Sequence, residues 1–399
     1  MDTLSLVAVL AAWALAAPLA VISLYMLAIV VGSWLYGPGK RLQASASSFA
    51  VIVPAHDEEQ GIAGTISQLL TTGYPPGKVR ILVIADNCTD RTAEVARDAG
   101  ATVVVRKDPD NRGKGQALDW FLREHRDLVE DRDLVAFIDA DMQVDRQFFA
   151  SMVAAFSAPT RVVAQGRYMV ANPCRNVLSA IGYASFCYVN HVRPAGRCFW
   201  GGTADLKGSG MVFRTQFLLR RGWNAHSIAE DIQLGKELML DGVRVAYVPS
   251  ARVESDIPAT LAQVRVQQSR WEGGKHEVYA SIRPRTASAF FRNPSMLLLD
   301  GLLDLMVPPL SMIILLNLAG LVLSWWSGSA SLWVFIASIA IFGLAVLSGL
   351  LQNRAPAGLY LRLLAAPAFV VWKLLLLLRV KAAAAPTTWQ RTPRDPRKP

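Results

Sequence analysis

Two long stretches without a charged residue constrain this chain more than any other feature of its sequence. The first runs from Thr3 to Gly39 and the second from Leu305 to Asn353. A helix needs about 20 apolar residues to cross a bilayer. The first stretch therefore allows one span, and the second allows two spans separated by the polar sequence SGSAS at 327–331. A signal peptide is the alternative interpretation of the N-terminus, but the run is too long and no basic region precedes it.

Basic residues beside these stretches predict the orientation of the chain. Lys40 and Arg41 follow the first span, Arg292 precedes the second and Arg354 follows the third. Because cytoplasmic loops are enriched in Lys and Arg, residues 40–292 are expected on the cytoplasmic side of the inner (plasma) membrane. The net charge of +10 then favours contact with an anionic leaflet or an anionic substrate, and not with nucleic acid.

A further apolar segment, residues 361–381, contains Lys373 near its middle. This lysine divides the segment into runs too short to cross a bilayer, and Arg362 falls on nearly the same helical face. We therefore expect an amphipathic helix in the headgroup region. A fourth span is the alternative, but it would export the basic tail against the positive-inside rule. The expected organisation is a membrane segment at 1–39, a cytoplasmic domain at 40–292, two spans at 293–353, an interfacial helix at 354–385 and a cytoplasmic tail at 386–399.

The cytoplasmic part alternates apolar strands with helices. Strands are expected at 50–55, 80–86, 102–105 and 134–139, and helices at 61–70, 92–100 and 115–125. Continuous apolar strands separated by helices are typical of a parallel sheet that is covered on both faces, which predicts an α/β fold. Ligands bind such sheets at the carboxyl ends of the strands. The sequence places HDEE, DNCTD and DAD there, after the first, second and fourth strands.

Asp139 and Asp141 lie one residue apart where an apolar strand ends. Two carboxylates this close repel each other unless a cation lies between them. Mg²⁺ suits the position, because it commonly binds one or two carboxylates together with substrate phosphates. The pair alone is explained equally well by a structural role, with Asp139 capping the next helix and Asp141 in solvent.

Three further motifs carry chemistry. Lys114 stands between two glycines before a helix in RGKGQALD, where backbone N–H groups and its ammonium group suit a diphosphate. The motif AED pairs Glu230 with Asp231, and one acid of such a pair can become a general base. In QQSRW, Arg270 could neutralise a leaving diphosphate and Trp271 could support a sugar ring. Alone, each motif also fits a structural role: a glycine-rich turn, an acidic first helical turn or a membrane-surface helix.

Together these motifs resemble those of the membrane-bound family 2 glycosyltransferases, the branch that contains cellulose, chitin, hyaluronan and poly-N-acetylglucosamine synthases. The resemblance extends over roughly residues 50–274, in the order VIVPAHDEE, VIADNCTD, RGKGQALD, DAD, AED and QQSRW. It implies a GT-A fold, which is a Rossmann-like nucleotide-sugar-binding domain. It also implies inverting transfer of a sugar from a nucleoside diphosphosugar, above all a UDP-sugar, to a membrane-associated glycan or lipid, with Mg²⁺ or Mn²⁺ as cofactor. The expected context is exopolysaccharide or cell-surface glycan synthesis.

The resemblance also implies roles for individual residues. Asp231, beside Glu230, would take the proton from the acceptor, and Asp141 would bind the metal with Asp139. The tail sequence WQRTPR resembles the gating segment of cellulose synthases, and LKGSGMVFR at 206–214 resembles the acceptor loop of the family. The donor site would consist of Asp57, Asp86, Lys114, Asp139, Gln267, Arg270, Trp271, Thr392 and Arg394.

The small number of spans leaves the product open. Three spans are few for enclosing a polysaccharide channel. The chain is therefore expected either to add one sugar to a ceramide-, hopanoid- or polyprenyl-type lipid, or to need a dimer or an export partner. A catalytically inactive assembly partner is a third class, against which the intact DxD, ED and QxxRW motifs argue.

Overall fold

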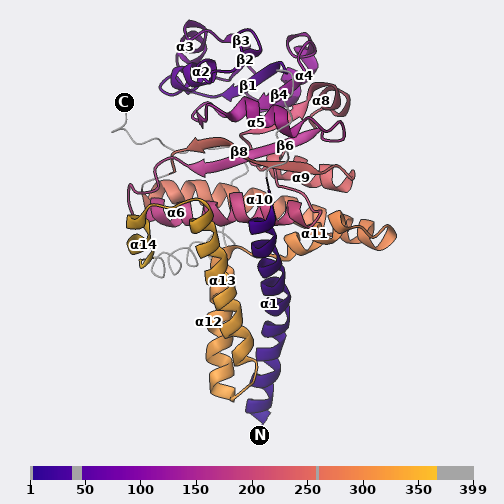
Figure 1. Cartoon of the computed structure of the whole chain (residues 1–399), viewed down its shortest axis with the longest axis vertical. Helices are drawn as coiled ribbons and strands as arrows, with labels where there is room; N and C mark the ends of the chain where they lie inside the picture. Colours follow the sequence, from indigo (N-terminus) through magenta and orange to yellow (C-terminus); the bar gives the residue numbers. More distant parts are fainter. Residues whose placement is uncertain (1–2, 38–46, 258–259, 366–399) are drawn as a thin grey trace.

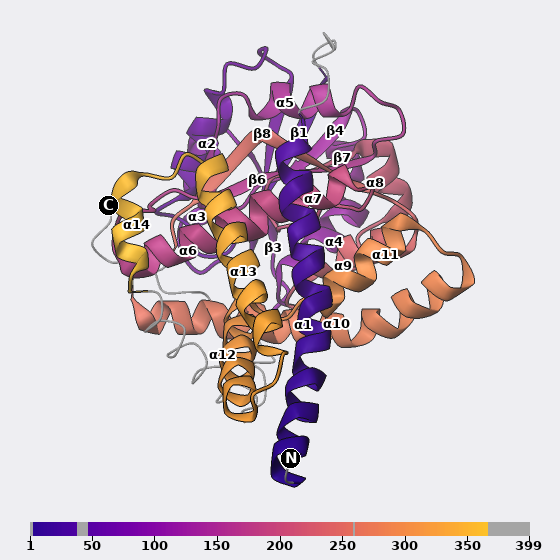
Figure 2. The same ribbon diagram turned by 60° about the horizontal axis from the view of Figure 1, so that its bottom comes forward.

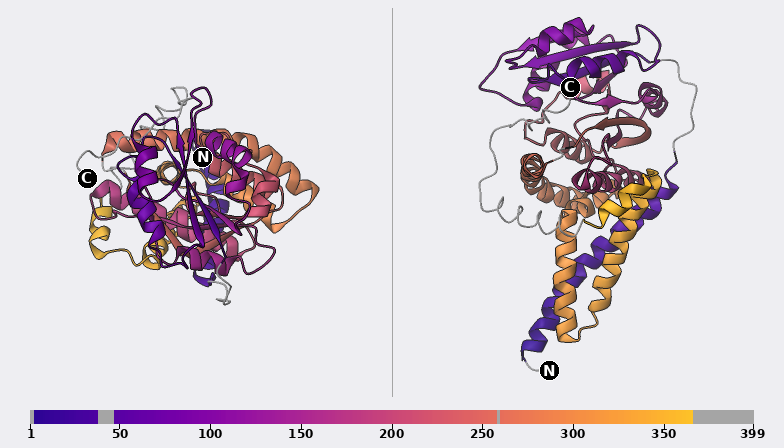
Figure 3. Two further views of the ribbon diagram at one scale, coloured as in Figure 1. Left: turned by 90° about the horizontal axis from the view of Figure 1, so that it is seen from above. Right: turned by 90° about the vertical axis from the view of Figure 1, so that its left-hand side faces the viewer.

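The computed structural model describes residues 3–37, 47–257 and 260–365. It has three parts, stacked along its long axis (Figure 1). A sheet with helices on both faces forms one end, a layer of helices lies beneath it, and three long helices project from that layer. Seen from the side, these three helices form one bundle that leaves the domain in a single direction (Figure 3).

The sheet has eight strands in the order β3-β2-β1-β4-β7-β6-β8-β5. The first half, β3 to β4, is parallel, as the sequence predicts. The second half is mixed, because β7 runs antiparallel to β4 and β6, and β5 runs antiparallel to β8. The prediction of a parallel sheet is therefore correct for only half of it. The strands are β1 Phe49–Ala55, β2 Val79–Asp86, β3 Thr102–Arg106, β4 Leu134–Phe137, β5 Gln143–Val144, β6 Val163–Val170, β7 Met211–Arg214 and β8 Val245–Ser255.

Both faces of the sheet are apolar and each is covered by helices. Along β1, Val51 and Val53 face one core whereas Ala50 and Ile52 face the other, as the two-residue period of a strand requires. The first core is closed by α2 Ile62–Leu70, α3 Thr92–Asp98 and α5 Phe148–Ala155. The second core is closed by α4 Lys114–Glu124, α8 Thr215–Arg221 and α9 Glu230–Leu240. A short 3₁₀ helix, η1, occupies Arg126–Leu128.

Three described helices are long and apolar enough to cross a membrane. They are α1 Thr3–Leu35, α12 Leu310–Ser327 and α13 Leu332–Gln352, which are the stretches that the sequence predicts. They pack closely through small residues: Ala12 and Ala16 of α1 are fully buried, and Gly320 of α12 leaves room for the ring of Phe335 of α13. Ser23 also donates a hydrogen bond of 2.8 Å to Ser338, which joins α1 to α13.

The intermediate layer lies between the sheet and the spans (Figure 1). Two of its helices were not expected: α10 continues for 32 residues through Pro284, and α11 precedes the two spans inside the segment 293–353. Helix α14 begins the expected interfacial segment, but residues 366–399, including Thr392 and Arg394, lie outside the described residues. The layer consists of α6 Val177–Cys187, the π-helical turn η2 Tyr188–Val192, α7 Arg193–Phe199, α10 Leu261–Arg292, α11 Met296–Met306 and α14 Ala357–Leu363.

Candidate active site

The carboxyl ends of the parallel strands collect the acidic residues that the sequence singles out. Asp57 follows β1, Asp86 ends β2 and Asp139 follows β4 by two residues. Because β1 pairs with both β2 and β4, these side chains share one edge of the sheet. The three acids therefore lie at one edge of the sheet, as the sequence predicts, and the remaining candidate residues can be located relative to this edge.

Asp86 is held by an arginine that was not predicted from the sequence. Arg106, at the end of β3, is almost fully buried, and its Nη1 atom lies 2.7 Å from Oδ1 of Asp86. Its Nη2 atom lies 2.8 Å from Oδ2 of Asp108. Burial raises the pKa of Asp86, although Arg106 acts in the opposite direction. A lone arginine at a strand end gives no signal of this role in the sequence.

Asp57 adopts a left-handed backbone conformation, with φ of 54°. Its Oδ1 atom accepts hydrogen bonds from the backbone N–H groups of Thr89, at 2.7 Å, and Asp90, at 3.3 Å. One ligand atom each from Asp57, Cys88 and Asp90 lie within 4.8 Å of one another. This cluster was not predicted. Since the Asp57 carboxylate is hydrogen-bonded to the loop after β2, the cluster already has a structural explanation.

Lys114 links Asp139, after strand β4, to Glu230, at the start of helix α9. It is the first residue of α4, after Gly113, whose φ of 122° favours glycine. Its ammonium nitrogen lies 2.5 Å from Oδ1 of Asp139 and 3.7 Å from Oε1 of Glu230, and donates a hydrogen bond to the carbonyl of Gly208. Burial alone would lower the pKa of Lys114. The negative charges of Asp139 and Glu230 raise it by more than burial lowers it, so the pKa lies above its ordinary value. The lysine therefore stays charged.

Glu230 and Asp231 begin α9, where unpaired N–H groups favour negative charge. Burial nevertheless raises the pKa of both carboxyl groups, to about 7 for Glu230. Lys114 acts in the opposite direction on each of them. Gly208 faces the pair: a Cβ atom placed on it would lie 3.5 Å from Oδ2 of Asp231 and 3.3 Å from Nζ of Lys114. A side chain there would fill the space beside both charged groups.

The loop that contains Gly208 is fixed by hydrogen bonds that the sequence did not reveal. The side-chain amide of Gln165, on β6, accepts from the N–H of Lys207 at 3.0 Å and donates to the carbonyl of Ser209 at 2.9 Å. The hydroxyl of Ser209 accepts from the N–H of Asp139 at 3.1 Å. The predicted acceptor loop is therefore bound directly to the DAD motif.

Helix α10 brings the QQSRW motif to the site. Gly274 packs on Ala229, immediately before Glu230, so closely that a Cβ atom placed on Gly274 would lie 3.1 Å from the Ala229 methyl group. Burial lowers the pKa of Arg270, and Glu230 and Asp139 partly offset this effect. Trp271 is partly exposed and lies near Phe186, with 6.4 Å between ring centroids. Gln267 is half-buried on the same helix.

The acids at the end of β4 fit a divalent cation in their chemistry. Asp141 is exposed at the sheet edge, and Asp139 is bound by Lys114 through Oδ1. Carboxylate oxygens are ligands that Mg²⁺ and Mn²⁺ prefer. The donor atoms of Asp139 and Asp141 are therefore chemically suited to a metal, and the metal site itself stays a prediction.

Comparison with known proteins agrees with this architecture. Residues 46–274 match the family described as glycosyltransferase like family 2. The β-monoglucosyldiacylglycerol synthase of Nostoc sp. is 28% identical over 246 residues, which cover 60% of this chain and 51% of that protein. The poly-β-1,6-N-acetyl-D-glucosamine synthase of Staphylococcus aureus is 28% identical over 238 residues, covering 57% of this chain and 54% of that protein. The chain thus spans about half the length of the curated relatives it matches.

A solved structure shares the fold. The mannosyltransferase PcManGT from Pyrobaculum calidifontis, in complex with GDP-Man and Mn²⁺, has a TM-score of 0.51 and 18% sequence identity, and the match covers 84% of this chain and 98% of that one. At this identity the similarity concerns the fold alone, which is GT-A-like with a mixed sheet. The family match covers more than half of the chain and contains every charged group of the site described above. On that evidence the chain belongs to glycosyltransferase family 2.

Proposed function

We propose that this protein transfers a sugar, with inversion, from a nucleoside diphosphosugar to an acceptor at the membrane. The observation that carries the proposal is the position of Lys114, which contacts Asp139 on the donor side and Glu230 on the acceptor side. Donor and acceptor chemistry are thereby held at one sheet edge, in a chain with three helices that could span a bilayer. The resemblance of the motifs to family 2 implies a UDP-sugar as the donor, and the names of two relatives refer to glucosyl and N-acetylglucosamine products.

On the donor side, Asp57 and Asp86 would contact the nucleoside, and Lys114 and Arg270 would face the diphosphate. Gln267 and Trp271 would line the same site from α10. Asp141 and Asp139 would hold Mg²⁺ or Mn²⁺, which when bound neutralises diphosphate charge. Fixed cations around a leaving diphosphate stabilise the charge that develops on it in the transition state.

On the acceptor side, Asp231 would accept the proton of the attacking hydroxyl. The acceptor oxygen forms a bond to the anomeric carbon while the bond from that carbon to the diphosphate breaks, and the electron pair leaves with the diphosphate. Attack from the face opposite the diphosphate inverts the anomeric configuration. Gly208 would leave space for the sugar or lipid headgroup beside the base.

A lipid acceptor that receives one sugar is favoured by the packing of the spans. Among the described residues, Ala16, Leu19 and Phe335 are buried together where α1, α12 and α13 meet. A bundle closed by these side chains supports a lipid acceptor reached from the bilayer more readily than passage of a polymer through one subunit. Polymer synthesis would require a dimer or an export partner, and an inactive assembly partner would show no turnover at all.

The base assignment is tested with purified full-length protein in lipid nanodiscs. A panel of UDP-sugars and GDP-mannose is incubated with diacylglycerol, ceramide and polyprenyl phosphate, and products are identified by mass spectrometry. With the productive pair, Asp231→Asn should lower kcat by about 10²–10⁴-fold, because a well-placed base contributes that much, while UDP still binds. The matched control is Asp241→Asn at the other end of α9, which should leave kcat unchanged. Near-normal kcat in Asp231→Asn would refute the assignment.

The metal assignment is tested separately. Removing divalent ions with EDTA should abolish turnover, and Mg²⁺ or Mn²⁺ should restore it. Asp141→Asn should lose both turnover and the Mn²⁺-dependent increase in UDP affinity, because a carboxylate ligand is lost. Asp145→Asn, four residues further on, is the control and should behave like the wild type. Undiminished turnover in excess EDTA would show that Asp139 and Asp141 hold no catalytic metal.

A further inference from the structure

Six charged side chains lie together between the sheet domain and the membrane-spanning helices; five are buried and Asp205 is partly buried. Three are cations and three are anions, and a further, more exposed cation, Lys207, lies 3.9 Å from Oδ2 of Asp205 at the edge of the cluster. We call it the junction network; it consists of Arg193, Arg197, Asp205, Lys236, Asp300 and Asp304. None of these residues belongs to the motifs that the sequence connects with catalysis.

Asp304, on α11, is the centre of the junction network and is fully buried. Its carboxylate lies 2.7 Å from Nζ of Lys236 on α9 and 3.2 Å from Nη1 of Arg197 on α7. It also accepts a hydrogen bond of 2.9 Å from Nε of Arg193. Burial alone would raise the pKa of Asp304, but these three cations lower it, so the carboxylate stays ionised.

The network reaches the acceptor half of the site by two routes. Lys236 is on α9, the helix that begins with Glu230 and Asp231, and it faces the junction five residues after Asp231. Lys236 also lies 2.8 Å from Oδ1 of Asp205, which in turn lies 3.0 Å from Arg197. Asp205 stands three residues before Gly208 in the loop that faces Asp231. One cluster thus ties down both the helix and the loop.

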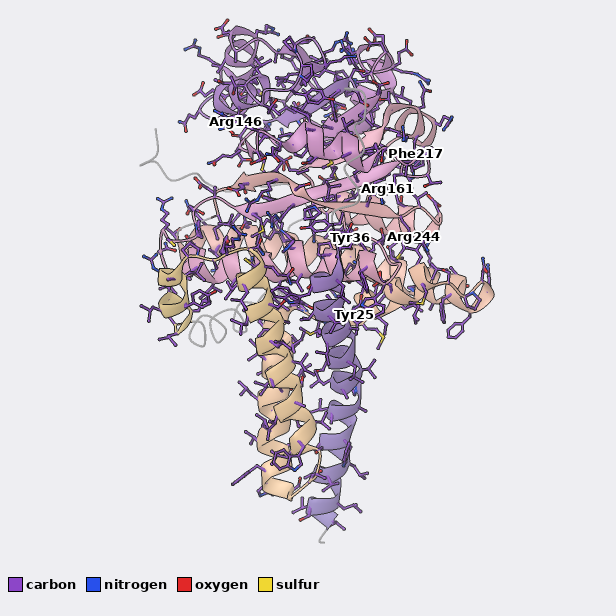
Figure 4. The ribbon with its side chains drawn as sticks, in the orientation of Figure 1. Tyr25, Tyr36, Arg146, Arg161, Phe217 and Arg244 are labelled. Carbon is purple, nitrogen blue, oxygen red and sulfur yellow. The ribbon has the colours of Figure 1, made fainter. Side chains whose placement is uncertain are left out.

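The same network is fixed to the membrane side. Asp300 of α11 lies 2.9 Å from Nη2 of Arg197 and accepts a hydrogen bond of 2.8 Å from the hydroxyl of Tyr25 on α1. Tyr25 is labelled where α1 meets the helical layer (Figure 4). Helix α11 leads directly into the span α12. The network therefore contacts one span and is covalently continuous with another.

Helix α7, which carries both arginines, packs directly on the backbone of α1 (Figure 2). A Cβ atom on Gly196 would overlap the carbonyl oxygen of Ile29, so the two helices approach as closely as glycine allows. The indole N–H of Trp200 donates a hydrogen bond of 2.8 Å to the carbonyl of Ala28. Arg193 and Arg197 belong to the same helix as Gly196, so the close packing of α7 on α1 fixes the backbone that carries them.

We propose that Asp304 is a positioning residue for the transfer reaction. Through Lys236 and Asp205, it sets the positions of two parts of the site from the membrane side: α9, which carries Asp231, and the loop that contains Gly208. The proposal rests on the proposed function for its kinetic part. A buried ion cluster usually stabilises a protein no more than apolar residues of the same volume would, so stability alone is a weak account of these six charges. A role in fixing the relative positions of α9, α11 and the loop at 203–208 is a stronger explanation for these charges.

The test compares Asp304→Asn with the double variant Lys236→Met/Asp304→Asn in full-length protein. The single change leaves a buried cation in excess and should lower the melting temperature. The double change restores equal numbers of positive and negative charges, and removes the link between α9 and α11. The double variant should therefore melt at a higher temperature than Asp304→Asn but keep a kcat reduced by about 10²-fold, since a shift of about 1 Å at a reacting group costs that much. The KM for the donor should be unchanged.

Hydrogen–deuterium exchange supplies a readout that does not depend on activity. In the double variant, peptides over 203–210 and 229–236 should exchange faster, while peptides over 79–106 in the nucleoside half should not change. Asp241→Asn, an exposed acid at the end of α9 and outside the network, is the control for kcat and exchange alike. Wild-type kcat in the double variant, or unchanged exchange over 203–210 and 229–236, would overturn the proposal.

The remaining outcomes are also decisive. If the double variant fails to fold, the network is a general stabilising element and the proposal is wrong. If the wild type transfers no sugar with any donor, the proposed function fails, and the exchange result alone decides whether Asp304 positions α9 and the loop.

Discussion

At the scale of single residues, burial raises the pKa of the two acids that begin α9, Glu230 and Asp231. Glu230 is almost fully buried, and this raises its pKa from 4.5 to about 7, with Lys114 opposing the shift. The raised pKa of a buried acid is a common property of catalytic carboxyl groups, because a base works best when its pKa is near the working pH. In this chain Glu230 supports Lys114, while Asp231 faces the space beside Gly208.

This shift predicts an unusual pH dependence. If Glu230 must be ionised to hold Lys114, kcat/KM should fall as pH drops through about 7, well above the range of an ordinary carboxyl group near 4. Glu230→Gln should remove this limb from the pH profile, with lower turnover throughout, whereas Glu237→Gln, on the same helix, should keep it. The sign for stability is the opposite one. The folded chain holds the Glu230 proton more tightly than the unfolded chain does. The protonated carboxyl group therefore contributes to the free energy of unfolding below pH 4.5, and this contribution is lost as pH rises through about 7. A wild-type profile without a limb near 7 would contradict the role of Glu230.

At the scale of elements, the sequence predicts those strands and helices that follow from the local pattern of apolar residues. The strands at 50–55, 80–86 and 102–105 are continuous apolar runs between helices, and the structure has them within one residue at each end. The strand expected to reach Asp139 ends at Phe137, because pairing with β1 stops at Ile52 and Phe137. These apolar runs, together with the position of the DAD motif, were enough to predict that the acids lie at one edge of the sheet.

What the sequence did not reveal depends on contacts between distant segments. The order of β6, β7 and β8 is set by pairing across long loops, which period and propensity do not encode. Arg106 and Lys236 look like ordinary surface cations in the sequence, yet they are buried against Asp86 and Asp304, which lie 20 and 68 residues away in the chain. Helix α10 passes through Pro284, a residue that usually ends a helix. These features appear only when the tertiary packing is known.

At the scale of the whole molecule, all three candidate spans leave the domain on the side of the intermediate layer (Figure 3). A catalytic domain on one side of the bilayer requires that the turn between α12 and α13 lie on the other. The positive-inside rule predicts a cytoplasmic location for the domain, since Lys40, Arg41, Arg292 and Arg354 flank it in the sequence. The same rule predicts that the basic tail at 386–399 lies on the same side of the membrane as the domain, as a gating segment would require.

This topology is tested by thiol labelling in sealed cells. The background carries Cys174→Ser, because Cys174 is the exposed native thiol of the described residues. Into it are placed Thr388→Cys in the tail and, as the control for the opposite side, Ala330→Cys in the exposed turn between α12 and α13. An impermeant maleimide should label Ala330→Cys in sealed cells and Thr388→Cys only after the membrane is opened.

The tail has a mechanistic consequence that the same cells can test. If Arg394 offers a cation to the diphosphate and Trp389 helps to exclude water, truncation after Ala385 should leave a folded, membrane-inserted protein with weaker UDP-sugar binding and a much lower kcat. A tail that only contacts anionic lipid would instead change membrane association and leave turnover in detergent as it was. Labelling of Thr388→Cys in sealed cells would put the tail on the wrong side of the bilayer for any contact with the donor, and would require a fourth span within residues 361–381.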